Sequence, residues 1–233
     1  MNIILYDLET TGLDINKNKI IEAYFYNLLD ETCLHLLINP ECKINPETIK
    51  IHNLTDFDVE RKPVFKDVVK DIYDFCSENA YLISHNNINF DKPFLKSEIK
   101  RAGFEIPSKW KYIDTLRLAR EMYPDLPNFK QDTLREKFGI KKDGSHRANK
   151  DVKDLVEIYK HMCHDKNIEE IYHISKNFYY KKMPFGKHKN KLLKDLPRDY
   201  IIWIMNNIDD KCLKRSFFKL KILKSKIKKK KSY

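Results

Sequence analysis

The chain has 233 residues, a formal net charge of +11, 42% hydrophobic residues and 12% aromatic residues. This composition supports a buried core and excludes an intrinsically disordered chain. No apolar run reaches the ~18 residues that a membrane span needs. No secretory signal is visible and the five cysteines are scattered without a CxxC pair, so we expect a cytoplasmic protein with reduced thiols and no membrane partner.

Three apolar segments near the N-terminus predict strands. Residues 2–7 favour a strand buried on both faces, 19–29 an alternating strand, and 33–39 a third strand after a turn at Asp30 and Glu31. Residues 65–76 have helical spacing of apolar positions, and 80–86 favour a second buried strand. Helical patterns dominate from 91 to about 165, so the order of elements predicts an α/β fold with a mixed sheet flanked by helices.

The region after residue 165 has a different character. Residues 166–182 are polar and rich in tyrosine, which favours a linker or an irregular helix. "PFGKHKNKLL" predicts two short strands around a Lys-Asn-Lys turn, and "LPRDYIIWIMNNI" predicts a helix, which together form a small α+β module over 183–218. A Lys-rich tail follows over 219–233.

The positive charge is concentrated at the C-terminal end. Residues 211–233 contain 11 Lys and Arg and no acid, whereas the first 210 residues balance 34 basic residues against 34 acidic residues. A block of one sign usually stays solvated. The functional alternative is that it neutralises phosphates of a nucleic acid.

Three acidic sites have separate ordinary explanations. Asp7 and Glu9 share a face because strand side chains alternate, but they could simply lie at a strand end that reaches solvent. Asp91 could cap the helix that it begins. Asp151 could be an acid in the first turn of a helix, with His146 in the loop before it. Hard oxygen ligands suit Mg²⁺ or Mn²⁺ if the acids converge.

In combination these motifs are specific. D-x-E-T-T-G at 7–12, H-N-x3-F-D at 85–91 and H-x4-D at 146–151 resemble the DEDDh 3′–5′ exonucleases, a family with a ribonuclease-H-like fold. The blocks at 44–55, 113–120 and 134–140 agree, and the resemblance covers residues 1–165. Residues 183–208 resemble the C-terminal module of the exodeoxyribonuclease X group, although the Lys-rich end beyond Phe218 departs from that pattern. The module is either a cap packed on the nuclease domain or a DNA contact.

The resemblance implies a catalytic set with assigned roles. Asp7 would bridge two Mg²⁺ or Mn²⁺ ions, Glu9 and Asp151 would complete one, Asp91 would hold the other, and His146 would accept a proton from the attacking water. The backbone from Thr10 to Leu13 would hold the terminal nucleotide, with Gly12 allowing close approach and Leu13 wedging under the base. Leu13 could also be a plain core residue.

Further residues are weaker candidates for the site. His85 and Asn86 could help to shape it. Phe90 could stack on a base, although a position beside a buried strand favours the core. His161, Cys163 and His164 lie close together, but no second ligand pair has zinc spacing, so we expect a surface cluster.

The expected activity is hydrolysis of DNA from 3′ ends, preferably single-stranded, to nucleoside 5′-monophosphates in repair or maintenance. An exoribonuclease of the same superfamily is the alternative, because the residues do not distinguish deoxyribose from ribose. Two further hypotheses are a polymerase proofreading partner and a nucleic-acid-binding module without catalysis. Clustered acids, which repel phosphate, argue against the last.

Overall fold

The computed structural model describes residues 1–141 and 148–222. The chain divides into two compact units, one ending at Lys176 and the other beginning at Asn177. Within the described ranges, every helix is too short or too polar to cross a lipid bilayer.

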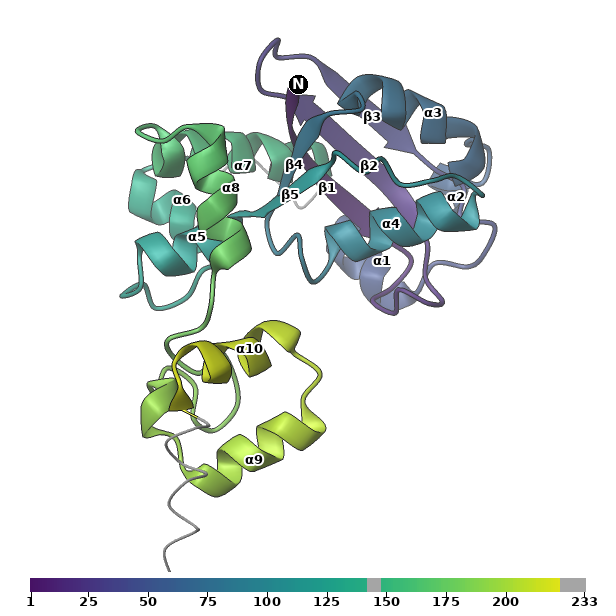
Figure 1. The fold of residues 1–233 in the computed structure, drawn as a ribbon. Coiled ribbons are helices and arrows are strands. Elements are labelled where there is room, and N and C mark those ends of the chain that lie inside the picture. The colour runs from purple at the N-terminus through teal and green to yellow at the C-terminus, as the bar shows by residue number, and fades with distance from the viewer. Residues whose placement is uncertain (142–147, 223–233) are drawn as a thin grey trace, which may run out of the picture. The chain divides into compact units, whose positions relative to one another are not determined.

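The first unit is built on one five-stranded sheet in the order β3-β2-β1-β4-β5 (Figure 1). β1 pairs antiparallel with β2, and β2 antiparallel with β3, whereas β1–β4 and β4–β5 are parallel. This confirms the predicted mixed sheet and the N-terminal meander. The strand bounds are β1 Asn2–Thr10, β2 Ile20–Asn27, β3 Cys33–Leu37, β4 Ala80–Ser84 and β5 Lys111–Asp114.

Strand β5 lies in a region where the sequence predicts only helices. Its four residues, KYID, are too few to show a period, and the strand forms because β4 offers a parallel edge beside it. The predicted strand β4 is confirmed, and all five of its residues are buried. Such a continuous apolar strand is expected where helices cover both faces of a sheet.

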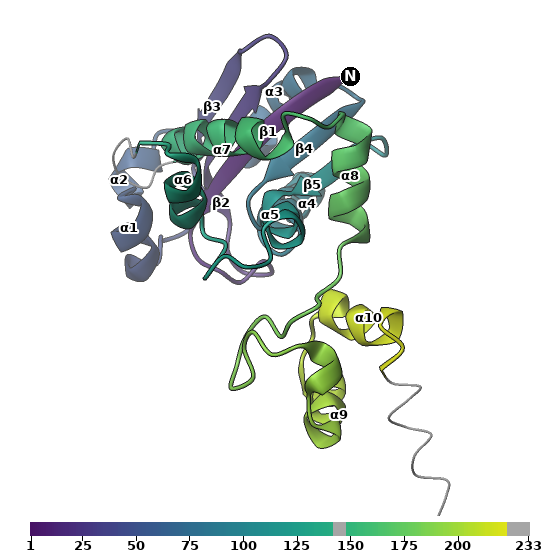
Figure 2. The same cartoon turned by 90° about the vertical axis from the view of Figure 1, so that its left-hand side faces the viewer.

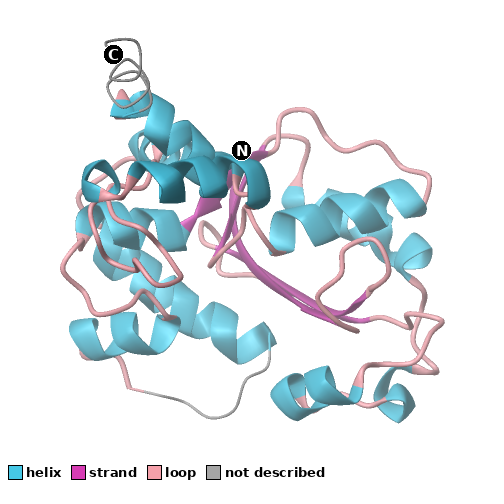
Figure 3. Ribbon diagram, turned by 90° about the horizontal axis from the view of Figure 1, so that it is seen from below, coloured by secondary structure: helices cyan, strands magenta, loops and turns pink. Residues whose placement is uncertain are grey.

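Helices lie on both faces of this sheet (Figures 2 and 3). One face packs on α3 and α4, and α3 coincides with the helix predicted over 65–76. The other face packs on α5 to α8, with α7 lying across β1 and β2. Two short helices, α1 and α2, form a smaller cluster beside Ile21. The helix bounds are α1 Pro46–His52, α2 Asp56–Val59, α3 Phe65–Cys76, α4 Asp91–Arg101, α5 Thr115–Met122, α6 Gln131–Phe138, α7 Ala148–Cys163 and α8 Ile168–Asn177.

Helix α8 occupies much of the segment 166–182, for which a linker or an irregular helix is expected. The Ser175 hydroxyl accepts a hydrogen bond from the Asp114 amide at 2.9 Å, and Glu169 forms an ion pair with Lys111 at 2.8 Å. Ile171 is buried in the same core as α7. The division between units therefore falls after Lys176, later than the limit at 165 expected from sequence.

The second unit has a helical core of its own. It contains a 3₁₀ turn at Leu193–Asp195, helix α9 (Arg198–Asn207) and helix α10 (Lys211–Lys219). The helix predicted within 196–208 is confirmed as α9. The two strands predicted within 184–193 are wrong, because this described segment contains only an isolated bridge that pairs Lys182 with Leu192. The unit is therefore helical rather than α+β.

Helix α10 lies where the sequence suggests the beginning of a solvated basic block. The Asp210 side chain caps it by accepting from the Leu213 amide at 2.8 Å. Leu213 and Phe217 are fully buried. A regular apolar spacing thus makes a basic segment helical, with its lysines on the outer side. Of the Lys-rich tail expected over 219–233, residues 223–233 lie outside the described residues.

Candidate active site

Asp7 and Glu9 lie near the C-terminal end of β1 and share one face of the sheet. Leu5, on this face, packs in the core beneath α7, whereas Leu8, on the opposite face, packs beneath α3 and α4. Since side chains alternate along a strand, both acids project toward the α7 side. Helix α7 carries Asp151 in its first turn. The fold therefore brings together acids that are far apart in the sequence.

The three carboxylates converge closely enough to hold a metal ion. One oxygen of each of Asp7, Glu9 and Asp151 lies within 4.8 Å of the others, and all three residues are partly buried. Burial, followed by the charges of Asp91 and Glu9, raises the pKa of Asp7 well above its usual range. Carboxyl groups this close together are stable only when some of them are protonated or when a cation neutralises their charge.

Asp91 supplies a fourth, more deeply buried carboxylate. Its side chain is 1% exposed, and Oδ2 accepts a hydrogen bond from the Ser84 hydroxyl at 2.6 Å. Oδ1 is buried and has no hydrogen-bond partner among the described residues. Burial raises the pKa of Asp91 to about 7, although the Ser84 bond opposes this rise. Phe90, not Asp91, occupies the N-cap of α4, so the capping explanation is wrong.

The loop before Asp91 is held by buried hydrogen bonds. Asn87 donates to the carbonyl oxygens of Leu82 and Ile113 at 2.9 and 2.8 Å, and it accepts from the Tyr6 hydroxyl at 2.6 Å. These bonds connect the loop to three neighbouring strands. Asn87 is thus a positioning residue that sequence reasoning missed. Its indicator in the sequence was a second asparagine directly after the buried strand.

His85 and Asn86 also hold this loop. The His85 ring contacts the Thr115 hydroxyl and the Phe129 carbonyl oxygen, both at 2.9 Å, and burial lowers its pKa to about 4. The ring is therefore neutral at physiological pH, with both nitrogens engaged. The Asn86 amide donates to Asp114 at 3.1 Å. These bonds fix the end of β4, and the substrate contact predicted for His85 and Asn86 stays a prediction.

The turn after β1 combines a buried start with an exposed tip. The Thr10 hydroxyl donates to the Gly12 carbonyl oxygen at 2.7 Å. A Cβ at Gly12 would lie 2.7 Å from Oδ1 of Asn18, which is itself held by the Asp14 amide at 2.8 Å. Leu13 is 75% exposed, so the alternative of a core residue is wrong. An exposed leucine in the turn that follows Glu9 is available to contact a substrate.

Glu22 is a fifth acid near the cluster that sequence reasoning missed. It is fully buried on β2, directly opposite Glu9, and it forms an ion pair with His35 at 2.7 Å. Its Oε2 also accepts from the Ala148 amide at the start of α7. Glu22 adds to the charges that raise the pKa of Asp7. A single acid within the apolar run at 19–29 was the available indicator.

Two remaining sequence candidates have different outcomes. The Phe90 ring packs against Phe94 with centroids 4.9 Å apart at the edge of the α3–α4 core, which supports the interpretation as a core residue. His146 lies outside the described residues. Among those described, the group of His, Cys, Asp or Glu residues with metal-ligand spacing is Asp7, Glu9 and Asp151.

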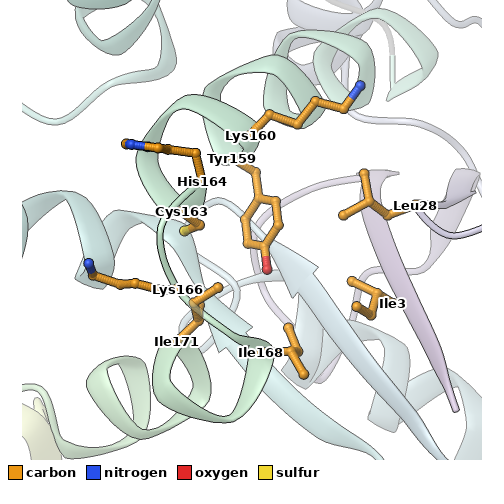
Figure 4. A pocket seen from close by; sticks show the side chains of 9 residues that line it. All are labelled: Ile3, Leu28, Tyr159, Lys160, Cys163, His164, Lys166, Ile168 and Ile171. Carbon is orange, nitrogen blue, oxygen red and sulfur yellow. The ribbon is translucent and has the colours of Figure 1, made fainter.

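A pocket of about 350 Å³ lies at the opposite end of β1 from these acids. Tyr159 points into it, whereas Lys160 and His164 point away, so the space is mainly apolar (Figure 4). His161 instead stacks on Phe138, with centroids 5.5 Å apart. The pocket is therefore separate from the carboxylates and offers no ligand set. It is lined by Ile3, Leu28, Tyr159, Lys160, Cys163, His164, Lys166, Ile168 and Ile171.

Comparison with known proteins agrees with this geometry. A family model described as "Exonuclease" matches residues 4–159. A second model, named for a quorum-sensing-regulated virulence factor, matches residues 173–208. A solved structure, "Exonuclease X in complex with 5′ overhanging duplex DNA", aligns with a TM-score of 0.58 and 25% identity over 74% of this chain and 99% of that chain.

Curated relatives include two kinds of polymerase protein. The DNA polymerase III PolC-type protein of Caldanaerobacter subterraneus is 33% identical over 159 residues, which are 67% of this chain and 11% of that protein. DNA polymerase III subunit epsilon of Rickettsia prowazekii is 32% identical over 166 residues, which are 67% of this chain and 71% of that protein. This chain thus spans only about a tenth of the PolC-type polymerase.

Proposed function

Because this chain belongs to the exonuclease family whose model spans residues 4–159, we propose that it hydrolyses DNA from the 3′ end and releases nucleoside 5′-monophosphates. The observation that carries this proposal is the convergence of Asp7, Glu9 and Asp151 within 4.8 Å, beside the buried Asp91. A protein that only binds nucleic acid gains nothing from acids that repel phosphate. We place the activity in DNA repair or maintenance.

The carboxylates fit a pair of divalent cations. Oxygen ligands of this kind suit Mg²⁺ or Mn²⁺. The unpartnered Oδ1 of Asp91 and the raised pKa of Asp7 are what a ligand set prepared for cations would show without them. Asp7, Glu9, Asp91 and Asp151 would hold the ions. Such ions lower the pKa of bound water and stabilise charge on the leaving oxygen.

The protein groups around the acids would orient the reactants. Ser84 holds Asp91 through its hydroxyl, and Asn87 fixes the loop that leads to Asp91. The exposed Leu13 would lie against the terminal base, with the backbone from Thr10 to Gly12 following the sugar. His146 would accept the proton of the attacking water, as the family resemblance implies.

The substrate could be DNA or RNA, and the activity could serve DNA repair or proofreading beside a polymerase. The curated relatives are DNA polymerase proteins, and Exonuclease X was solved in complex with duplex DNA, so DNA is favoured over RNA. Similarity to subunit epsilon over 71% of its length also supports a second candidate function, proofreading beside a polymerase. Co-purification with a polymerase would support that second function.

The decisive experiment follows a 5′-labelled single strand over time with Mg²⁺. We expect a ladder of products shortened from the 3′ end, together with nucleoside 5′-monophosphates. EDTA and Asp7→Asn should both stop the reaction. Asp71→Asn, which removes an exposed acid from α3, is the matched control and should leave the rate unchanged.

Matched DNA and RNA strands, single and double, would establish the preferred substrate. Faster digestion of RNA would move the assignment to the exoribonuclease alternative. Internal cuts or loss of nucleotides from the labelled 5′ end would contradict the proposal. Tight binding of the strand without any shortening would support the non-catalytic alternative.

A further inference from the structure

The second unit exposes an aromatic pair on helix α9. Tyr200 and Trp203 lie one turn apart, and their rings stack with centroids 5.7 Å apart and planes 14° apart. Trp203 is 48% exposed. A large, flat and half-exposed ring that is held parallel to its neighbour is a rigid platform, since little conformational freedom remains to be lost when another ring is added.

A lysine-rich turn lies beside this pair. The His188 ring meets the Tyr200 ring edge to face with centroids 4.5 Å apart, and Nζ of Lys187 lies 5.7 Å from the Tyr200 ring centre. Lys189 and Lys191 continue the turn and are exposed. We call the six residues Lys187, His188, Lys189, Lys191, Tyr200 and Trp203 the aromatic–lysine patch.

The turn is ordered by its backbone. The Met183 amide donates to the Lys191 carbonyl oxygen at 2.7 Å, and the Asn190 amide donates to the Met183 carbonyl oxygen at 2.8 Å. Gly186 has φ +72°, and a Cβ there would lie 3.1 Å from the Tyr200 hydroxyl. Only glycine combines this φ with so close an approach at no cost. The backbone that carries the three lysines is therefore held in one conformation close to Tyr200 of α9.

Charge favours a polyanion as the partner. Residues 177–222 contain twelve Lys and Arg but four Asp and Glu. Among the described residues, no ion pair is found for Lys187, Lys189 or Lys191. Burial, followed by the charges of Lys187 and Lys191, lowers the pKa of His188, which favours a neutral ring that can take part in stacking.

Two other occupants fit the patch less well. The centres of protein–protein interfaces are depleted in lysine, whereas this patch contains three. Helices that bind membrane surfaces carry their lysines on the polar face of the helix itself, but here the lysines lie on the turn, and α9 carries the two stacked rings. Alternating flat rings and cations instead match alternating bases and phosphates.

We propose that the aromatic–lysine patch binds single-stranded nucleic acid, with a base stacked on Trp203 and phosphates against Lys187, Lys189 and Lys191. The patch gives the second unit a role in capturing strands, separate from the carboxylates, all of which lie in the first unit. The inference rests on the proposed function only for the identity of the strand as DNA.

The test uses the whole chain in EDTA, so that binding is measured without cleavage. Anisotropy of a labelled dT12 strand should show binding that Trp203→Ala weakens about tenfold, as expected for the loss of one stacked base. Phe218→Ala removes another exposed aromatic ring of the same unit, from α10, and should have no effect. The strand should also quench tryptophan fluorescence in the wild type but not in Trp203→Phe, since the other tryptophan, Trp110, is buried.

Salt dependence provides a second, independent readout. Lys187→Gln combined with Lys189→Gln should reduce the slope of log affinity against log salt by about 1.4, at roughly 0.7 for each phosphate contact of a single strand. Lys66→Gln combined with Lys70→Gln removes the same charge from exposed positions on α3 and should leave the slope unchanged.

The outcomes separate this inference from the proposed nuclease activity. Unchanged affinity in Trp203→Ala, or quenching by phosphatidylserine vesicles but not by dT12, would overturn the inference even if the chain shortens DNA. Conversely, if Trp203→Ala weakens binding but the wild type leaves 3′ ends intact with Mg²⁺, the proposed function fails and the inference stands.

Discussion

Replacing Asp91 with asparagine measures how much the buried carboxylate destabilises the metal-free fold. Asp91 is 1% exposed, and burial raises its pKa from 3.8 to about 7. The folded state therefore binds the proton more tightly than the unfolded state. The contribution of this proton to the free energy of unfolding is fully present below pH 3.8 and is lost as the pH rises through 7. A difference of about 3 in pKa corresponds to ~4 kcal/mol.

The asparagine side chain avoids the cost of a buried charge, but it adds a smaller cost of its own. Its oxygen can still accept the Ser84 bond, but its buried NH₂ replaces an oxygen that has no partner and costs roughly 1–3 kcal/mol. In EDTA at pH 8 we expect Asp91→Asn to be more stable than the wild type by on the order of 1–3 kcal/mol. Near pH 4 the protonated wild type should be the more stable protein.

Urea unfolding in EDTA at several pH values between 4.5 and 8 checks this expectation. Asp71→Asn, at an exposed position, is the control and should differ from the wild type by the same amount at every pH. Saturating Mg²⁺ at pH 8 should stabilise the wild type by about 2.7 kcal/mol at a hundred times the Kd, and the variant by less. A pH-independent difference between Asp91→Asn and the wild type would refute the argument that Asp91 is destabilised by its own burial.

Three further expectations concern the turn after β1 and the loop before Asp91. Gly12→Ala should lower the free energy of unfolding by about 1–3 kcal/mol, because its Cβ overlaps the Asn18 side chain; thermal melts that match the wild type would contradict this. Leu13→Ala should leave stability within ~0.5 kcal/mol, since Leu13 is exposed, but raise KM for single-stranded DNA; an unchanged KM would remove Leu13 from the substrate site. Asn87→Ala should cost on the order of 3 kcal/mol in urea unfolding, because it leaves two carbonyl oxygens and the Tyr6 hydroxyl without their partner; a loss below ~1 kcal/mol would show that water replaces these bonds.

The predictable parts of the fold are the helices and strands whose own apolar residues recur at regular spacing. β1, β2, β4, α3 and α9 each carry enough apolar residues at regular spacing to indicate their type. β5 has four residues and exists because β4 accepts it, so its cause lies outside its own sequence. The hairpin predicted within 184–193 failed for a related reason. The Lys-Asn-Lys turn does form, but Met183 and Leu193 on either side of it are buried in the same core as α9 instead of belonging to strands.

For some residues of the candidate site the sequence indicated the residue itself, but not how it is brought to its neighbours. Asp7, Glu9, Asp91 and Asp151 were predicted through motifs. The convergence of Asp7, Glu9 and Asp151 depends on α7 lying across β1, which a sequence alone does not establish. Glu22 and Asn87 were missed because their roles arise only from what they face across the sheet and loop. Supporting residues of this kind have ordinary neighbours in sequence and become recognisable only in three dimensions.

The distribution of charge matches the two tasks that the proposed nuclease activity requires. Residues 1–176 contain 27 Lys and Arg against 30 Asp and Glu, whereas 177–222 contain twelve against four. Carboxylates that hold cations also repel a phosphodiester until those cations are bound, so the acid cluster cannot supply the attraction that captures a strand. The second unit can supply it. Removal of metal should therefore act mainly on the chemical step, and added salt mainly on capture.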